Sequence, residues 1–300
     1  MSQVKKAVVT GASGLIGRAL LDLLVDTGVE VVAIDKAPAT TQRARALELD
    51  LCRPNGISAL LDADTVLFHL AASADVRASV ANPRHDYSNT LCAFFEILEA
   101  ARATGARVIF PSTASVFDPL APLPLSECSA KRPSSPYGAA KLAGEAYCFA
   151  YNKSYGLDVR IARMFSVYGP GMKRLAIHDI IRKLERTPSE IEILGDGSQI
   201  RDYLHVRDAA RGLLTIATRG SAGEDYNLAS GLPVTLMDLT RTIARLMGCP
   251  DVAIVPTGES FVGDTPRWYA AVSKIREIGF EPAISLDDGL RETIDALRSQ

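Results

Sequence analysis

The stretch Val8-Val9-Thr10-Gly11-Ala12-Ser13-Gly14-Leu15-Ile16-Gly17 decides the fold of this chain. It begins inside an apolar, β-rich run and leads into a helical pattern of apolar residues that starts at Leu15. In such a strand-turn-helix context, glycines let the backbone turn tightly and approach a pyrophosphate at the positive end of the helix. The sequence therefore predicts a dinucleotide-binding turn made by Gly11, Ser13, Gly14, Leu15, Ile16 and Gly17.

An acidic residue follows the second apolar run, residues 29–34, about twenty residues after the glycines. This residue, Asp35, can accept hydrogen bonds from the adenosine ribose hydroxyls and repel a 2′-phosphate, so NAD is favoured over NADP. Lys36 follows directly and can attract that phosphate, which leaves NADP as the alternative. The other interpretation of Asp35 is a solvated charge at the end of a strand.

Much further along the chain, Tyr137 and Lys141 are four residues apart, which places them on one face of a helix. A nearby ammonium stabilises phenolate, and it moves the tyrosine pKa from about 10 toward neutrality so that tyrosine can act as a base. Alternatively, the two are ordinary neighbours on a helix surface. Glu145, one turn later, is interpreted as a helical partner of Lys141.

The composition is that of a globular protein without a dominant charge. The chain has 300 residues, of which 47% are apolar, and a formal net charge of −2, so nucleic acid and anionic membranes are not expected partners. Five widely spaced cysteines without a C-x-x-C pair indicate free thiols, and the histidines lack metal-ligand spacing, so no metal is expected. No apolar run has membrane-spanning length, and a cytoplasmic location is expected.

Strand and helix patterns alternate through the first half of the chain. This alternation predicts an α/β fold with a Rossmann-type doubly wound parallel sheet. We expect residues 1–165 to form the nucleotide-binding domain and residues 166–300 to form mainly a smaller α/β substrate lobe, with the chain returning to the sheet around residues 202–228. The strands are expected near residues 4–10, 29–34, 65–70, 106–111 and 157–163.

Further motifs follow in order along nearly the whole chain. They are Asp50-Leu51, His69-Leu70-Ala71-Ala72, Asn89, Ser112-Thr113, Arg163 to Pro170 and Gly195 to Asp208. With the glycine turn and the Tyr137–Lys141 pair, this ordered set resembles the extended short-chain dehydrogenase/reductase family, in particular its NAD-dependent nucleotide-sugar epimerases and dehydratases of the UDP-glucose 4-epimerase type. The resemblance implies that NAD is also contacted by Asp50, Leu51, Leu70, Ala71, Ala72, Asn89, Tyr137 and Lys141.

The resemblance also implies a mechanism of transient oxidation. Tyr137 takes the proton from a sugar hydroxyl while hydride leaves that carbon for the nicotinamide, and Thr113 hydrogen-bonds the same oxygen. If hydride returns to the opposite face of a 4-keto sugar, the product is an epimer. The implied substrate contacts are Ser112, Thr113, Tyr137, Ser166, Arg174, Arg201 and Arg267.

The two residues that follow Thr113 argue against reactions other than epimerisation. Ala114 and Ser115 stand where related dehydratases have Asp and Glu, and neither side chain transfers protons as a carboxyl does. Dehydration and decarboxylation are therefore disfavoured, whereas an NAD(P)H-dependent reductase of a 4-keto-6-deoxy sugar stays open. A protein that binds NAD without catalysis is the least favoured alternative, because Thr113, Tyr137 and Lys141 are all present.

Three departures from the family pattern, at Ser166, Phe261 and Phe117-Asp118, leave the nucleotide and the sugar open. Arg201 resembles a clamp for the substrate diphosphate, and its alternative is a surface ion pair with Asp202 or Asp196. Ser166 stands where the family usually has Asn, and Phe261 stands near the place of a second diphosphate Arg.

The helix after Tyr137 is apolar around much of its circumference, so it must bury two faces. One face can pack on the sheet, and the other can join the preceding helix in a two-helix contact between subunits. A homodimer is therefore expected, with an unusually buried monomer helix as the alternative. The apolar residues of the preceding helix are Leu91, Phe94, Phe95 and Leu98.

Overall fold

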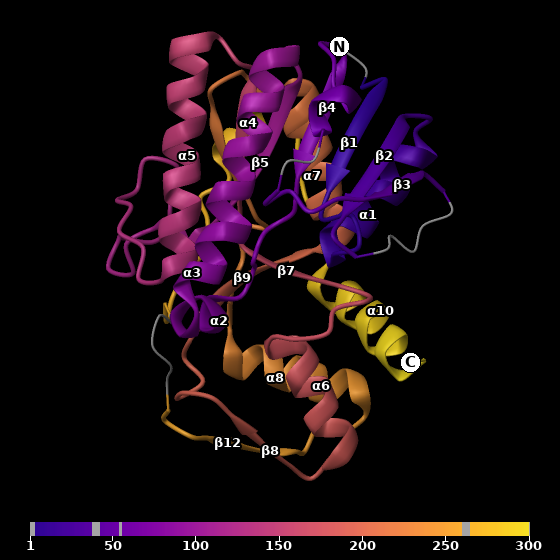
Figure 1. Cartoon of the computed structure of the whole chain (residues 1–300). Helices are drawn as coiled ribbons and strands as arrows, with labels where there is room; N and C mark the ends of the chain where they lie inside the picture. Colours follow the sequence, from indigo (N-terminus) through magenta and orange to yellow (C-terminus); the bar gives the residue numbers. More distant parts are fainter. Residues whose placement is uncertain (1–3, 38–42, 54–55, 260–264, 300) are drawn as a thin grey trace.

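The computed structural model describes residues 4–37, 43–53, 56–259 and 265–299. Within these residues, seven parallel strands form a central sheet in the order β10-β6-β5-β4-β1-β2-β3 (Figure 1). The predicted α/β fold with a doubly wound parallel sheet is confirmed. The strands are β1 (Lys6–Thr10), β2 (Glu30–Asp35), β3 (Arg45–Glu48), β4 (Thr65–His69), β5 (Arg107–Thr113), β6 (Val159–Met164) and β10 (Asp225–Leu228).

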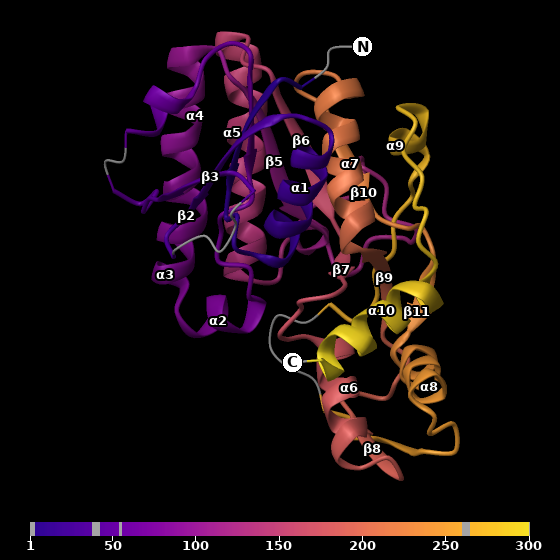
Figure 2. The same ribbon diagram turned by 90° about the vertical axis from the view of Figure 1, so that its right-hand side faces the viewer.

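Helices cover both faces of the sheet. Strands such as β1, β4 and β6 are therefore buried on both sides. On one face, Leu20 and Leu24 of α1 (Leu15–Asp26) pack in a core with Leu213 of α7 (Val206–Arg219). On the other face, α4 (Ala93–Thr104) and α5 (Pro136–Tyr155) build a second core that contains Phe94, Ile97 and Cys148 (Figure 2). The strand order reverses direction between β1 and β4, and ligands bind at the carboxyl ends of strands at such a switch point.

The expected strands correspond to β1, β2, β4, β5 and β6. Sequence patterning missed β3, because three of its four residues are exposed and it has no continuous apolar run. The chain comes back to the sheet through α7 and β10, and β10 pairs in parallel with β6.

A second lobe lies below the carboxyl edge of the sheet and has its own core (Figure 1). Its helices are α6 (Ala176–Arg186), α8 (Leu236–Met247) and α10 (Leu286–Arg298), which bury Ile181, Leu239 and Leu290. A small sheet joins the lobes in the order β11-β9-β7, and β8 pairs with β12 at the far end of the second lobe. These strands are β7 (Ser166–Tyr168), β8 (Glu190–Ile193), β9 (Ile200–His205), β11 (Pro233–Thr235) and β12 (Ala253–Pro256).

Short helices and turns connect the larger elements. They are α2 (Val76–Ala81), α3 (Pro83–Tyr87), a π-helical turn at Ser88–Cys92, 3₁₀ turns at Ile57–Leu60 and Ala114–Val116, and α9 (Ser273–Glu277). None of the helices in the described part of the chain is long and apolar enough to cross a membrane.

Candidate active site

A cavity of about 750 Å³ opens at the carboxyl ends of β1, β4 and β5 and extends toward the loop before α6. It brings together all the predicted cofactor contacts, which come from segments far apart in the sequence. These lining residues are Gly11, Ser13, Gly14, Leu15, Ile16, Gly17, Asp35, Lys36, Asp50, Leu51, Leu70, Ala71, Ala72, Asn89, Tyr137 and Lys141.

The glycine turn at one end of the cavity has no room for side chains at two positions. Gly11 has φ +67°, and a Cβ there would lie 2.6 Å from the backbone nitrogen of Ala71. A Cβ on Gly17 would lie 2.3 Å from the carbonyl oxygen of Gly11. The turn leads directly into α1, and the buried hydroxyl of Ser13 has no hydrogen-bond partner among the described residues. These residues fit a dinucleotide, whose pyrophosphate can approach the bare backbone and the first turn of the helix.

Asp35 at the end of β2 braces this turn. Its carboxylate accepts hydrogen bonds from the backbone N–H of Ser13 at 2.9 Å and of Ala37 at 3.2 Å. Lys36 points toward Asn89, because its Nζ donates to the Asn89 Oδ1 at 3.4 Å. The acid therefore holds the phosphate-binding turn as well as facing the cavity.

The start of α5 determines where Tyr137 lies. The Ser135 side chain caps the helix by accepting a hydrogen bond from the Gly138 N–H at 3.2 Å. Pro136 occupies the first turn, where a backbone N–H would have no partner within the helix, so proline is tolerated there. The backbone N–H of Tyr137 donates to the Ser79 hydroxyl of α2 at 3.2 Å. On the other side of the site, the Thr113 hydroxyl at the end of β5 accepts from the Ser115 N–H at 3.2 Å.

The electrostatics of the Tyr137–Lys141 pair differ from the expectation. Burial raises the pKa of Tyr137 to about 12, and a hydrogen bond with Thr113 partly offsets this effect. Burial lowers the pKa of Lys141 to about 8, and its Nζ donates to the Pro111 carbonyl at 2.7 Å. The charge of Asp86 raises the pKa of Tyr137 further and that of Arg174 lowers it, and the lowering by Lys141 stays a prediction.

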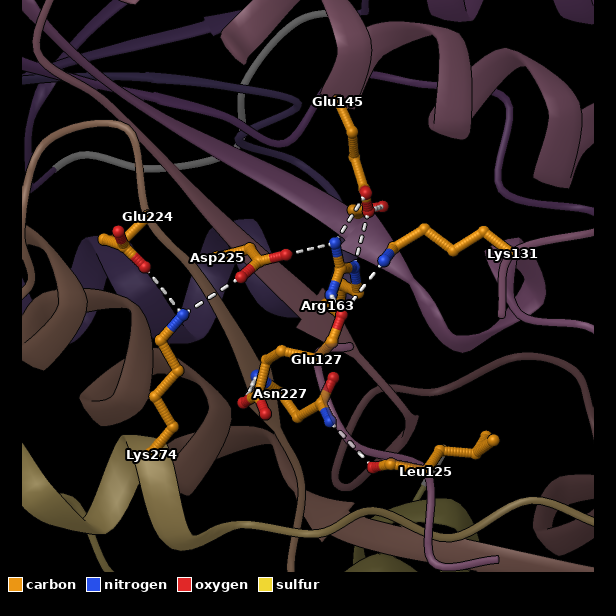
Figure 3. Close-up of polar contacts among 10 residues, drawn as sticks. Leu125, Glu127, Lys131, Glu145, Arg163, Glu224, Asp225, Asn227 and Lys274 are labelled. Atoms are coloured by element: carbon orange, nitrogen blue, oxygen red, sulfur yellow. Dashed lines mark hydrogen bonds and ion pairs between the residues drawn. The ribbon is translucent and has the colours of Figure 1, made fainter. Parts of the chain in front are cut away.

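The interpretation of Glu145 as a helical partner of Lys141 is wrong. Glu145 forms a two-point ion pair with Arg163 of β6, with both N–O distances 2.8 Å, and it accepts from the Ser112 hydroxyl at 2.5 Å (Figure 3). Arg163 also pairs with Asp225, which in turn meets Lys274 of α9 at 3.1 Å. The hydrogen-bond partners of Glu145 are therefore Arg163 and Ser112 in the protein interior, and not Lys141.

The predicted substrate contacts divide into two groups. Ser112, Thr113, Tyr137 and Arg174 line the cavity, and Arg174 also pairs with Asp75 across its mouth at 2.7 Å. Ser166, Arg201 and Arg267 are not among the described lining residues, and their assignment to substrate stays a prediction.

Arg201 packs against Trp268 in the described part of the chain. It stacks on Trp268 with 4.4 Å between the guanidinium and the ring centre, and it donates to the Pro266 carbonyl at 3.0 Å. The carboxylate of Asp202, one alternative partner, instead accepts from Ser230 and from backbone N–H groups. Phe261, which was expected near the place of a second diphosphate Arg, lies outside the described residues.

Several cavity residues were missed from the sequence. Arg18 and Lys173 line it, and Arg18 also donates to the Gly171 carbonyl at 3.2 Å. The place of Arg18 directly after Gly17, and one turn after Gly14, was an available signal. Asp86, buried close to Tyr137 and Lys141, had none, because an acid in a polar helical stretch is typical of exposed surface.

Comparisons with known proteins agree with the fold and the cavity. Residues 7–229 match the model of the NAD dependent epimerase/dehydratase family. The chain is 31% identical to an uncharacterized UDP-glucose epimerase of Bacillus subtilis, with 98% of each chain covered. It is also 31% identical to a dTDP-glucose 4,6-dehydratase of Streptomyces griseus, covering 96% of this chain and 92% of the relative.

A solved structure adds a ligand-bound relative. The UDP-glucuronic acid 4-epimerase of Bacillus cereus, in complex with NAD and a fluorinated UDP-sugar, is 28% identical, with a TM-score of 0.89 over 98% of this chain and 99% of the other. The resemblance to nucleotide-sugar epimerases and the expectation of NAD as cofactor are confirmed at the level of the family. This chain belongs to the NAD-dependent epimerase/dehydratase family.

Proposed function

We propose that this protein is an NAD-dependent epimerase of a nucleotide-diphosphate sugar that works through a transient 4-keto intermediate. One observation carries the proposal. Thr113, Tyr137 and Lys141 line the same cavity as the glycine turn, whereas the carboxyl groups among its described lining residues are only Asp35 and Asp50. Both of these acids belong to the adenosine end, so the reacting end has a tyrosine base and no carboxylic acid.

The side chains of this site divide the chemical work. When bound, NAD supplies a reversible hydride acceptor at the reacting carbon. Tyr137 takes the proton of the sugar hydroxyl and later returns it. Thr113 hydrogen-bonds the same sugar oxygen and so orients the hydroxyl toward Tyr137. Lys141 holds the nicotinamide ribose through its remaining N–H donors. Residues 1–165, with the returning segment, hold NAD, and residues 166–300 mainly hold the substrate.

The environment of Thr113 supports epimerisation over loss of water. Ala114 is buried, and the Ser115 hydroxyl accepts a hydrogen bond from the Thr113 hydroxyl at 3.3 Å. Eliminating water needs an additional acid and base, and these two positions provide neither. Reduction of a 4-keto-6-deoxy sugar by NAD(P)H is the second candidate, because it needs only Thr113, Tyr137 and Lys141.

We also propose that the protein is a homodimer through α4 and α5. Of the residues expected at this contact, Phe94 and Leu98 are instead fully buried within the subunit, because they pack on the sheet. The outer face carries Phe95 against Tyr147, with 5.7 Å between ring centres, and Phe149 is also exposed. The five cysteines are unpaired, which supports a reducing compartment such as the cytoplasm.

The decisive experiment uses a panel of UDP-, GDP-, CDP- and dTDP-sugars in deuterated water without added reductant, followed by NMR and mass spectrometry. An isomeric sugar of unchanged mass, with no net change in NADH, supports the epimerase. Incorporated deuterium would indicate enolisation in place of hydride return. Loss of water or of carbon dioxide, or turnover only with NAD(P)H and a keto sugar, would move the assignment to a dehydratase, a decarboxylase or the reductase.

Two tyrosine variants separate catalysis from binding. Tyr137→Phe should abolish turnover and leave NAD bound, because it removes one hydroxyl from the reacting end. Tyr155→Phe, a change at an exposed residue at the other end of α5, should keep full activity. If Tyr137→Phe stays fully active, Tyr137 is not the base.

A further inference from the structure

Asp86 is a buried acid that the proposed mechanism does not use. Its residue on α3 is 1% exposed, and within the described part of the chain no positively charged side chain hydrogen-bonds its carboxylate, on which the neutral Ser73 hydroxyl acts. Such a carboxylate is destabilising unless a positive charge compensates for it. Asp86 does not line the cavity, but the adjacent His85 and the nearby Asn89 do.

Lys141 is a buried positive charge whose hydrogen-bond partner carries no negative charge. It is 3% exposed, and the one hydrogen-bond acceptor the structure gives its ammonium is the Pro111 carbonyl, with the Phe110 ring centre 4.8 Å away. An ammonium has three donors, and a buried one also needs a nearby negative charge.

Two carboxylates act on Lys141, and only one of them is uncommitted. Glu145 is already neutralised by its two-point ion pair with Arg163 (Figure 3). Asp86 has no such pair, and of the charges that raise the pKa of Lys141 its effect is the largest. Since α3 packs directly against α5 (Figure 1), the charge of Asp86 lies close enough to Lys141 to raise the pKa of the ammonium.

We propose that Asp86 is the counter-ion of Lys141 and a positioning residue that keeps this ammonium charged and aimed at the nicotinamide ribose. This inference rests on the proposed function, because it takes Lys141 as a ligand of NAD. The Asp86 carboxylate acts through Lys141 and does not touch the sugar.

The surrounding titratable groups determine how the pair responds to pH. The charged and titratable groups around Asp86, Lys141 and Tyr137 are His69 at the end of β4, His85 on α3, Glu145 and Cys148 on α5, and Arg174 before α6. Burial raises the pKa of Asp86, whereas a hydrogen bond with Ser73 and the charges of Lys141 and His85 lower it. Removing the negative charge of Asp86 must lower the pKa of Lys141, so its ammonium is lost at a lower pH.

The test is NAD binding by calorimetry from pH 6 to pH 10. Asp86→Asn keeps the shape and removes the charge, and we expect the pH at which NAD binding is lost to fall by about 1 unit. Asp86→Glu should keep the native profile, and so should Glu96→Gln, which removes an exposed carboxylate from α4. An Asp86→Asn profile that overlies the native one overturns the proposal. In the Lys141→Met background, Asp86→Asn should have no further effect on the profile, and an undiminished shift there also overturns it.

A second measurement covers the case in which Asp86→Asn does not fold. With aspartate labelled by ¹³C at the carboxyl, the Asp86 resonance should titrate at a higher pH in Lys141→Met than in the native protein, because the coupling between two sites is reciprocal. Identical titrations would reject the pairing. Neither measurement needs sugar turnover, so a failed sugar assay would reject the epimerase and leave this result intact.

Discussion

Arg163 and Glu145 form a fully buried ion pair. The Arg163 guanidinium on β6 donates two hydrogen bonds, of 2.8 Å each, to the Glu145 carboxylate on α5. The exposed fractions of their side chains are 0% and 1%. Glu145 is one turn after Lys141, so this pair fixes the rotation of the helix that presents Tyr137 and Lys141 to the cavity.

Breaking this pair should destabilise the protein strongly. Arg163→Met leaves the Glu145 carboxylate buried without its positive partner, and we expect a loss of about 3–5 kcal/mol in the free energy of unfolding. The matched control is Arg245→Met, which breaks an ion pair with Asp287 whose side chains are 52% and 48% exposed, and which should change stability by about 1 kcal/mol or less. Urea denaturation of both variants measures the difference, and equal losses would contradict the argument.

His69 should make the protein sensitive to acid. Burial, helped by the charge of Lys141, lowers the pKa of His69 to about 3, so the unfolded chain takes up this proton first as the pH falls. Stability is therefore lost below the unfolded pKa of 6.5, by about 2 kcal/mol between pH 7.5 and pH 5.

The variant His69→Asn tests this sensitivity. It should remove that part of the slope of stability against pH, whatever its effect on absolute stability. His178→Asn changes a histidine outside the sheet, at the start of α6, and should keep the native slope. An unchanged slope in His69→Asn would show that another group titrates in this range.

Gly17→Ala should weaken NAD binding by about tenfold or more, or about 1.4 kcal/mol. The physical reason is that the new Cβ would lie 2.3 Å from the Gly11 carbonyl oxygen, and the whole phosphate-binding turn must shift. Gly28→Ala serves as the control, since Gly28 has φ +78° with no atom near the new Cβ. That variant should lose about 1 kcal/mol of stability but bind NAD normally. Calorimetric titration with NAD would show whether the two variants differ.

Asp35→Asn should move the cofactor preference toward NADP. The substitution keeps one oxygen to accept from the Ser13 N–H but removes the charge that repels a 2′-phosphate. We expect the ratio of the dissociation constants of NADP and NAD to fall by about tenfold, or about 1.4 kcal/mol. Asp22→Asn, on the exposed side of α1, should leave the ratio unchanged. A ratio insensitive to both changes would mean that Asp35 acts only by bracing the turn.

Much of this molecule was determined by local sequence patterns. The strand-turn-helix around Gly11, the acid Asp35 and the four-residue spacing of Tyr137 and Lys141 depend on residues close in the chain. Their geometry follows from backbone conformation and from the period of a helix or a strand. The fold class, the family and the cofactor could therefore be predicted before any coordinates were known.

Tertiary structure decided which partner each buried group has. Glu145 pairs with Arg163 and not with Lys141, Phe94 packs inside the subunit, and Tyr137 has a raised pKa, because packing and burial bring together segments that are distant in sequence. The proximity of Asp86 to Lys141 arises in the same way, from the contact of α3 with α5. A sequence records which groups are charged, but desolvation and charge pairing depend on distances that exist only once the chain has folded.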